Sequence, residues 1–542
     1  MKQTRTVLAL TAFAWLTGCM DLKETPVTGV SAEYYGTAAG ANAATVGAYI
    51  RLKDFYGQES EVLMAQLGTD SWEKGEQLQA NSFWNDYTAQ LGPSSPDPLT
   101  ARWQNFYQGV NAANTAIAAI SNSAALDAAT KNLRLAESRW IRALMYFNLV
   151  RTWGAVHLDT LPTVGVVTTA TRTPAAEVYA RVIIPDLEFA VANLPLKQTE
   201  VMRATKGAAQ TLLAEVYLTR AAAGDFDKAR DLTTAVIASN TYRLNPSYRA
   251  LFCGPDTSLG SCDYAPSQKA DPELIFSVQF IGDGAVDPFG NSLHLYYTMG
   301  YDVGGNAVPT LARTRNYGRP FRRLRPTLHL LRLFDKTKDV RYENTFQQLW
   351  RQPNGDTAIY FPGTPTAVKT GQGRKYGESE YTGILFPSIL KWQDQTRADP
   401  NTFPSHRDRW LWRLADVYLL RAEANIRAGR PADASADINV LRTRAAKPGQ
   451  DNTVSATELT AFNASPLDFL LDERERELAA EELRWYTLAR QGSAVFLARI
   501  KAYNPTAVAN VQAFHLLRPI PQTQIDRTEG GKDAFPQNPG YN

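Results

Sequence analysis

The chain has 542 residues, of which 44% are hydrophobic and 20% charged, and its formal net charge is +3. Two of the positive charges, Lys2 and Arg5, lie at the extreme N-terminus, so the rest of the chain is close to neutral. A chain of this length can bury a large core, and its charge gives no electrostatic basis for binding nucleic acid.

The N-terminus has the layout of a secretory signal peptide. Its basic residues precede an apolar run, residues 7–16, which is about half as long as the ~20 residues of a membrane-spanning helix. The following Leu16-Thr17-Gly18-Cys19 resembles the bacterial lipobox, in which a diacylglycerol is attached to the cysteine sulfur before cleavage. We therefore expect residues 1–18 to be removed and the acyl chains on Cys19 to hold the protein at a membrane.

Amphipathic helices are the commonest pattern after this segment. RLAESRWIRALMYFNLVRTWG predicts one helix, because apolar residues recur there at spacings of three and four. The residues on this face are Leu133, Ala136, Trp140, Ala143, Phe147 and Val150.

Two later segments repeat each other. LAEVYL at 213–218 matches LADVYL at 414–419, and each is followed by a break and a second alanine-rich helix. The breaks lie at Gly224-Asp225 and at Gly429-Arg430-Pro431, and Ala229 and Ala434 occupy equivalent positions after them. Small residues at helical spacing let two antiparallel helices approach closely, so the repeats predict tetratricopeptide-like helix pairs.

The middle of the chain, residues 241–405, is rich in Gly, Pro and aromatic residues and mostly lacks helical periodicity. DPELIFSVQF predicts a strand, whereas LHLYYTMGYDVGG and YGESEYTGILFP predict loops or short hairpins. In an exported protein, Cys253 and Cys262 within CGPDTSLGSC predict a disulfide. No histidine lies near either cysteine, which disfavours a metal site.

An acidic block near the C-terminus raises the question of catalysis, because paired carboxylates are what a glycosidase needs. The block contains Glu473, Arg474, Glu475, Arg476, Glu477, Glu481, Glu482 and Arg484. Three glutamates recur there every four residues beside arginines, which is typical of a salt-bridged helix face. The five histidines (His157, His294, His329, His406 and His515) have no metal-binding spacing. We therefore expect neither an enzyme nor a cofactor or metal.

Blocks along nearly the whole chain resemble the SusD/RagB family of surface nutrient-binding lipoproteins. They are, in order, CMDLKETPVTGVSAEYYGT, RLAESRWIRALMYFNLVRTWGAVHL, TKGAAQTLLAEVYL, FDKARDLTTAVIASNTYRLNPSYRALF, DPELIFSVQF, LLDERERELAAEELRWYTLARQG and RPIPQTQIDRTEGGKDAFPQNPGYN. The last two are the most specific, since they resemble the family patterns ERRxELAFEGxRWxDLxRxG and PIPxxEI…QNPGY.

The resemblance implies a fold and a role. The fold is mainly α, with tetratricopeptide-like helix pairs in a right-handed superhelical scaffold and a loop-rich, aromatic-rich ligand-binding region with short strands. We expect one large domain from 19 to 542, with the scaffold mainly at 37–240 and 406–542 and the insert at about 241–405. The implied role is capture of oligosaccharides, or of peptides, at the outer face of the outer membrane. The ligand then passes to a SusC-like TonB-dependent transporter, which the protein caps as a hinged lid through its tetratricopeptide-like face.

Two aromatic stretches predict the ligand site, because sugars bind flat rings and planar polar side chains. In family members that bind starch, an aromatic arc comes from about these regions. The candidates are Asp70, Trp72, Asn81, Trp84, Asn85 and Tyr87 in the first stretch, and Tyr296, Tyr297 and Tyr301 in the second. For each aromatic residue, packing in the core is the alternative.

The run RTRNYGRPFRRLR contains six arginines and no carboxylate: Arg313, Arg315, Arg319, Arg322, Arg323 and Arg325. Guanidinium groups suit carboxylates, sulfates and phosphates, so the run suggests an anionic glycan or anionic lipid headgroups as a ligand. The alternative is pairing with carboxylates elsewhere in the fold. For the whole protein, the alternative role is a helical-repeat envelope lipoprotein that scaffolds other proteins.

Overall fold

A computed structural model describes residues 32–35, 37–95, 98–253, 270–281, 287, 290–303, 311–351, 357–361 and 374–541. The predicted signal peptide, the lipobox with Cys19, and Cys262 lie outside these residues. Cys253 is buried and disulfide-bonded, but its predicted pairing with Cys262 involves a residue that is not described. Across the described residues, no helix has both the length and the apolar character needed to cross a bilayer.

The N-terminal part is a layer of long helices: α2 (Ala32–Tyr35), α3 (Ala38–Ile50), α6 (Leu99–Asn122), α7 (Ala128–Trp153) and α9 (Ile184–Asn193). Helix α7 begins after Asp127, whose carboxylate accepts a hydrogen bond from the Thr130 N–H at 2.9 Å. Helices α6 and α9 both pack against α7. On the predicted apolar face of α7, Leu133 is half-buried and the other five residues are buried. Nearly every other residue after Leu135 is buried too, because α7 has neighbours on more than one side.

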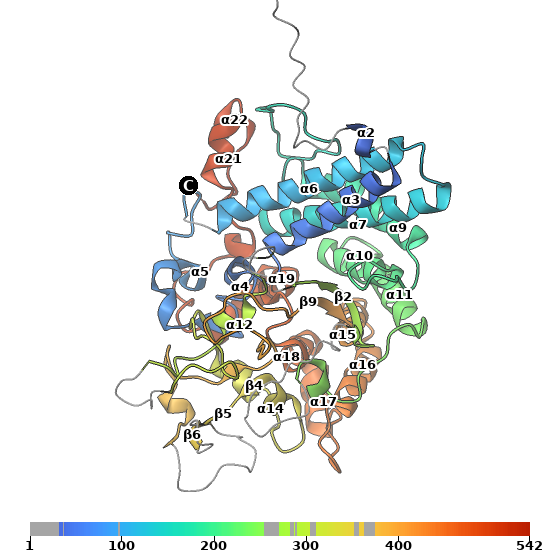
Figure 1. Cartoon of the computed structure of the whole chain (residues 1–542). Helices are drawn as coiled ribbons and strands as arrows, with labels where there is room; N and C mark the ends of the chain where they lie inside the picture. The colour runs from blue at the N-terminus through green and yellow to red at the C-terminus, as the bar shows by residue number, and fades with distance from the viewer. Residues whose placement is uncertain are drawn as a thin grey trace, which may run out of the picture.

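The predicted repeats form two helix pairs that lie next to each other. The first pair is α10 (Lys206–Arg220) and α11 (Asp225–Ala238), and the second is α15 (Leu414–Arg427) and α16 (Pro431–Arg444). Helix α11 packs directly on α15, so the pairs form one stack although they are far apart in sequence (Figure 1). Both breaks are where the sequence predicted them, and Gly224 and Gly429 each have a φ of +78°, which favours glycine. The prediction of stacked helix pairs is confirmed.

The insert between the pairs contains short strands. Strand β2 (Leu274–Val278), predicted from DPELIFSVQF, pairs antiparallel with β9 (Arg409–Arg413). The other pairings are β1 (Trp72–Lys74) with β3 (Leu324–Pro326), β4 (Phe346–Gln347) with β8 (Ser388–Ile389), and β6 (Thr357–Tyr360) with both β5 (Leu349–Arg351) and β7 (Arg374–Lys375). The expectation of a loop or hairpin at LHLYYTMGYDVGG was wrong at its start, where Leu293–Tyr296 form one helical turn, α12.

Short helices connect these parts: α4 (Glu59–Ala65), α5 (Phe83–Asp86), α8 (Ala175–Val178), α13 (Leu328–Arg332), α14 (Arg341–Thr345), α17 (Ala456–Ala464), α18 (Pro466–Leu478), α19 (Arg484–Ala489), α20 (Ser493–Tyr503), α21 (Gln522–Arg527) and α22 (Gly531–Ala534). One large apolar core runs from Ala48 to Phe535 and includes side chains from the helix layer, the stack and the insert. A smaller core within the insert contains Met299, Tyr301, Tyr317 and Trp350. The predicted fold class, mainly helical with tetratricopeptide-like pairs and short strands, is confirmed.

Candidate ligand-binding surface

The first predicted aromatic stretch is buried. Trp72, on β1, and Trp84, on α5, have no exposed surface, and Tyr87 is almost as well buried. The Trp72 ring packs edge-on against Tyr297, with the ring centroids 4.9 Å apart. The Tyr87 hydroxyl donates a hydrogen bond to the Gly68 carbonyl at 2.8 Å. None of these rings offers a free face to a ligand in this conformation.

The polar residues of that stretch bind protein groups instead. The Asp70 carboxylate accepts hydrogen bonds from Arg484 at 2.8 and 2.7 Å and from Arg499 at 2.8 Å. Burial raises the Asp70 pKa, but these two arginines outweigh burial and hold it well below its ordinary value. The Asn85 side-chain oxygen accepts from the Lys74 backbone N–H at 3.1 Å. Asn81 alone is half-buried.

The second predicted stretch forms a layer under the surface. Tyr296, Tyr297 and Tyr301 are all buried. The Tyr301 hydroxyl donates to the carbonyl of Gly318, and the Tyr296 ring packs against Phe321 with centroids 6.1 Å apart. Two of the three tyrosines thus support the arginine-rich segment from beneath.

Four of the six predicted arginines are paired with carboxylates. Arg313 pairs with Asp302, and Arg322 with Glu76 at 2.9 Å. Arg323 pairs with Glu59 at 2.6 Å, and Arg325 with Glu73, its opposite neighbour across β1 and β3, at 3.2 Å. These four arginines therefore pair with carboxylates of the fold, which was the alternative to ligand binding.

Of the other two arginines, Arg319 lies over two aromatic rings. Arg315 is exposed and Arg319 half-buried, and in the described part of the chain neither has a carboxylate partner. The Arg319 guanidinium lies over two rings, 4.7 Å from the Phe403 centroid and 5.2 Å from the Phe321 centroid. The two phenylalanine rings meet edge to face at 5.3 Å. We name Arg319, Phe321 and Phe403 the Phe403 cluster; Phe403 is 40% exposed.

Buried polar groups fix the two loops that carry this cluster. The buried Arg397 guanidinium donates to the backbone carbonyl of Thr402 at 3.2 Å and to that of Arg315 at 3.4 Å, so it joins both loops. The His294 Nε2–H donates to the Phe403 carbonyl at 2.8 Å. Burial lowers the His294 pKa to about 3, and Arg397 adds to the effect, so this imidazole is neutral at pH 7. The backbone that carries the exposed Phe403 ring is therefore fixed by these hydrogen bonds.

The arginine-rich segment is also strained at one residue. Arg322 has a φ of +47°, a left-handed conformation that costs a non-glycine residue about 1–2 kcal/mol. Its carbonyl accepts from the Gln77 N–H at 3.2 Å, and its guanidinium pairs with Glu76, so the surroundings enforce the conformation. Strain of this kind is frequent at binding sites.

The chemistry available at this surface is binding. An exposed ring can stack on the C–H face of a sugar, and neighbouring guanidinium groups can donate to hydroxyl or carboxylate oxygens. The nearby carboxylates already have partners: Asp302 pairs with Arg313, and Asp399 accepts from the Asn401 N–H at 2.7 Å and the Thr402 hydroxyl at 2.9 Å.

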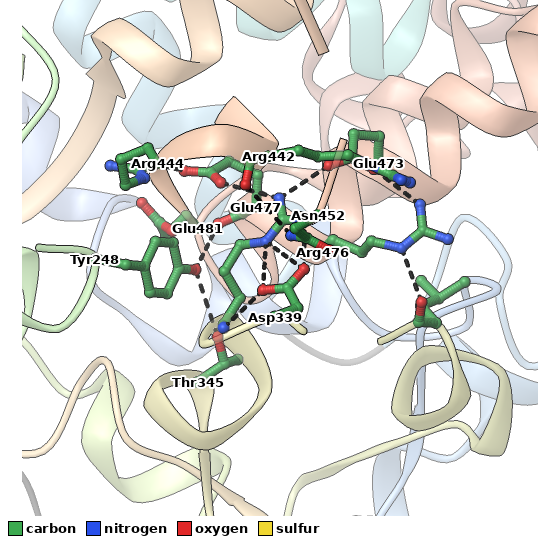
Figure 2. A network of polar contacts seen from close by, with 12 residues as sticks. Tyr248, Asp339, Thr345, Arg442, Arg444, Asn452, Glu473, Arg476, Glu477 and Glu481 are labelled. Atoms are coloured by element: carbon green, nitrogen blue, oxygen red, sulfur yellow. Dashed lines mark hydrogen bonds and ion pairs between the residues drawn. The ribbon is translucent and has the colours of Figure 1, made fainter. Parts of the chain in front are cut away.

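The acidic block is a buried ion-pair network (Figure 2). Glu473, on α18, accepts from Arg341, Arg442 and Arg476, each at 2.9 Å. Burial raises the Glu477 pKa, but Arg444, Arg413 and Arg341 outweigh burial and lower it to about 2. The interpretation of the block as salt-bridged is confirmed: some ion pairs lie within the block, such as Glu473 with Arg476, and others join it to distant segments, such as that with Arg341. The expectation of one helix face was wrong at Glu481, because α18 ends at Leu478.

A separate cavity of about 530 Å³ lies between α7, α10, α19 and the C-terminal segment. Tyr179, Phe514 and Leu517 form part of its walls, and the ion pair of Arg151 and Glu215, at 3.0 Å, forms part of its polar lining. No predicted site residue lines this cavity.

Sequence reasoning missed Phe403. The stretch DPNTFPS has a single ring and no periodicity, and it becomes notable only beside Phe321 and Arg319. The available signal was the arginine run, which contains two members of the cluster.

Two family descriptions match the chain. The "SusD family" matches residues 272–541, and "Starch-binding associating with outer membrane" matches residues 44–218. The first range covers the second helix pair and most of the insert, and the second covers most of the N-terminal helix layer and nearly all of α10, so α11 lies between the two matched ranges.

Individual proteins are similar over most of their length. SusD-like protein P2 of Formosa agariphila is 28% identical, covering 100% of this chain and 99% of its own. The starch-binding protein SusD of Bacteroides thetaiotaomicron is 27% identical over an alignment that covers 77% of this chain and 74% of that protein. The crystal structure of a SusD homologue from B. thetaiotaomicron superposes with a TM-score of 0.71. That protein is 21% identical, and the superposition covers 95% of this chain and 99% of the homologue.

Proposed function

The chain belongs to the SusD family, and on that premise we propose that it binds oligosaccharides at the surface around the Phe403 cluster and passes them to a SusC-like TonB-dependent transporter. The observation that carries the proposal is an exposed ring under the guanidinium of Arg319, which has no carboxylate partner among the described residues, on a backbone that Arg397 and His294 hold by hydrogen bonds. Peptides remain a second ligand class at the same surface.

The proposed location is the outer membrane, facing outward. It is supported by the lipobox sequence at Cys19 and by the family description that names association with the outer membrane. In this proposal, the acyl chains on the mature N-terminus provide the attachment.

We propose that the protein performs no reaction on its ligand. The carboxylates that could have acted as a catalytic pair, those of the acidic block, are held in ion pairs inside the fold. The starch-binding relative SusD is named for binding.

Of the predicted site residues, the proposal keeps those that can reach a ligand. Arg315 and Arg319 remain candidates for contact with an anionic sugar, since the other four arginines are neutralised by carboxylates. Asn81 remains a candidate hydrogen-bonding group. The buried rings Trp72, Trp84, Tyr87, Tyr296, Tyr297 and Tyr301 are core residues in this proposal and do not contact the ligand.

Calorimetry with the mature chain, after a glycan and peptide array has selected the ligand, tests the proposal. Phe403→Ala should weaken binding about fivefold or more, taking as a guide the roughly 1–3 kcal/mol of a base stacked on an aromatic side chain. Phe469→Ala is the matched control, because that ring also lies under two guanidinium groups, of Arg442 at 5.2 Å and Arg476 at 5.8 Å. Equal binding by both variants and the unchanged protein would reject the Phe403 cluster as the site.

A further inference from the structure

A long loop connects α7 to α8. It comprises residues 157–172 and is closed at its base by a bridge between Val156 and Thr173. The Val156 N–H donates to the Thr173 carbonyl at 3.1 Å, and the Thr173 N–H donates to the Val156 carbonyl at 2.8 Å. We name residues 157–172 the α7–α8 loop.

The outer part of this loop is apolar and exposed. Leu161 is 70% exposed, Val164 86%, Val166 94% and Val167 59%. No charged residue occurs from 160 to 171. Four exposed aliphatic side chains within seven residues form the kind of surface that proteins cover with a partner.

Hydrogen bonds from neighbouring helices hold the loop in shape. On α6, the Asn114 side chain donates to the Leu161 carbonyl at 3.0 Å, and the Asn111 side chain accepts from the Thr163 N–H at 2.8 Å. On the other side, the Glu529 N–H donates to the Thr168 carbonyl at 2.8 Å. The valines are therefore presented on a fixed backbone, and a partner meets little conformational entropy cost in the loop.

Polar groups surround the apolar residues. A cavity of about 210 Å³ lies between the loop and α6, and its lining includes Tyr107, Asn111, His157, Asp159, Thr169 and Gln524. An apolar centre next to fixed hydrogen-bonding groups is the anatomy of a protein–protein interface.

The α7–α8 loop lies at the end of the molecule that a lipid on Cys19 would hold near the membrane. Figure 1 shows it at the same end of the molecule as α2 and α22, away from β5 and β6. Helix α2 begins at Ala32, 13 residues after Cys19, and that length of chain extends at most about 45 Å. A lipid on Cys19 thus keeps this end of the molecule near the membrane.

We infer that the α7–α8 loop is the surface that docks onto the extracellular face of the membrane-embedded transporter. The inference rests on the proposed function, which supplies the partner. A lipid surface fits less well, because residues 160–171 contain no lysine or arginine to hold phosphate headgroups. The nearby Arg172 guanidinium is already used on backbone carbonyls, those of Ala155 at 3.0 Å and Pro536 at 2.9 Å.

The first test uses the full-length lipidated protein, purified from outer membranes in detergent. Val166→Asp and Val164→Asp should each reduce the amount of co-purifying TonB-dependent barrel at least tenfold, with oligosaccharide binding unchanged. Val508→Asp, in the segment between α20 and α21, is the matched control, because Val508 is also an exposed valine, at 43%, and lies outside the helix pairs. Equal recovery of the barrel with all three variants would overturn the inference.

A photo-crosslinker at position 164 of the full-length protein identifies what covers the loop. Crosslinks to peptides from extracellular loops of the barrel support the inference, whereas crosslinks only to lipid, only to a second copy of this chain, or to nothing overturn it. If the unchanged protein recovers the barrel but position 164 gives no crosslink to it, only the docking surface is rejected. If the unchanged protein recovers no barrel, both the docking surface and the proposed transfer of ligand to a transporter are rejected.

Discussion

Replacing Trp72 by alanine separates two views of the aromatic residues. The sequence favoured Trp72 as a ligand contact, for which the substitution should weaken binding and leave stability nearly unchanged. In the structure the ring is fully buried against Tyr297. We therefore expect a large loss of stability and little direct effect on binding by the folded protein.

The magnitude follows from burial and chain length. Truncating a buried tryptophan to alanine costs about 3–5 kcal/mol. At about 2.1 cal/mol/K per residue, a mature chain of roughly 520 residues that unfolds as one unit has an unfolding entropy near 1.1 kcal/mol/K. The substitution should thus lower Tm by about 3–5 °C.

Scanning calorimetry and titration of the selected ligand give the two readouts on the same samples. Trp72→Ala should show the lower Tm with a Kd within about twofold of the unchanged protein. Phe403→Ala should show the reverse, because the partly exposed ring contributes less to the core. If Trp72→Ala weakened binding tenfold at an unchanged Tm, the reasoning from burial would be refuted.

Three further predictions concern charge. In the folded protein the pKa values of Glu477 and Glu423 are lowered to about 2. Each carboxylate therefore stabilises the fold by roughly 3 kcal/mol above pH 4.5, and this stabilisation is lost as the pH falls towards 2. Urea unfolding midpoints measured at pH 7, 4.5 and 3 should fall only between pH 4.5 and pH 3. Arg341→Met leaves Glu473 and Glu477 short of a buried partner, so denaturation should show a loss of about 3–5 kcal/mol, and a loss below 1 kcal/mol would contradict the network's role. If the ligand is anionic, the double variant Arg315→Gln and Arg319→Gln should bind it more weakly, and its affinity should depend less on salt in titrations at 50 and 300 mM. Arg332 is an exposed arginine paired with Glu378, so the control variant Arg332→Gln should change neither the affinity nor its salt dependence.

The helix pairs could be predicted from the sequence because their signals are local. The LAEVYL and LADVYL repeats have helical spacing, and Gly224 and Gly429 mark breaks where the backbone takes a positive φ. Each signal acts within a few residues, so no knowledge of distant partners is needed. The charged helix of the acidic block was recognised for the same reason, although its partners Arg341 and Arg413 could not be named.

The ligand site could be predicted only as a region. Aromatic composition identified the segments around Trp72 and Tyr297, but composition does not show whether a ring is buried against another segment or exposed. Those two residues are distant in sequence, and their contact forms only when β1 and the segment after α12 come together. Phe403 carried no local signal at all.

The helix pairs, the strand β2 and the family could be inferred from the amino-acid sequence, because helical period, strand composition and ordered motifs are properties of neighbouring residues. Which rings are buried, which arginines are neutralised and which loop stays uncovered became clear in the folded chain. Burial and ion pairing depend on residues far apart in the sequence: Arg484 meets Asp70 from 414 positions away, and Arg397 reaches back 82 positions to the carbonyl of Arg315.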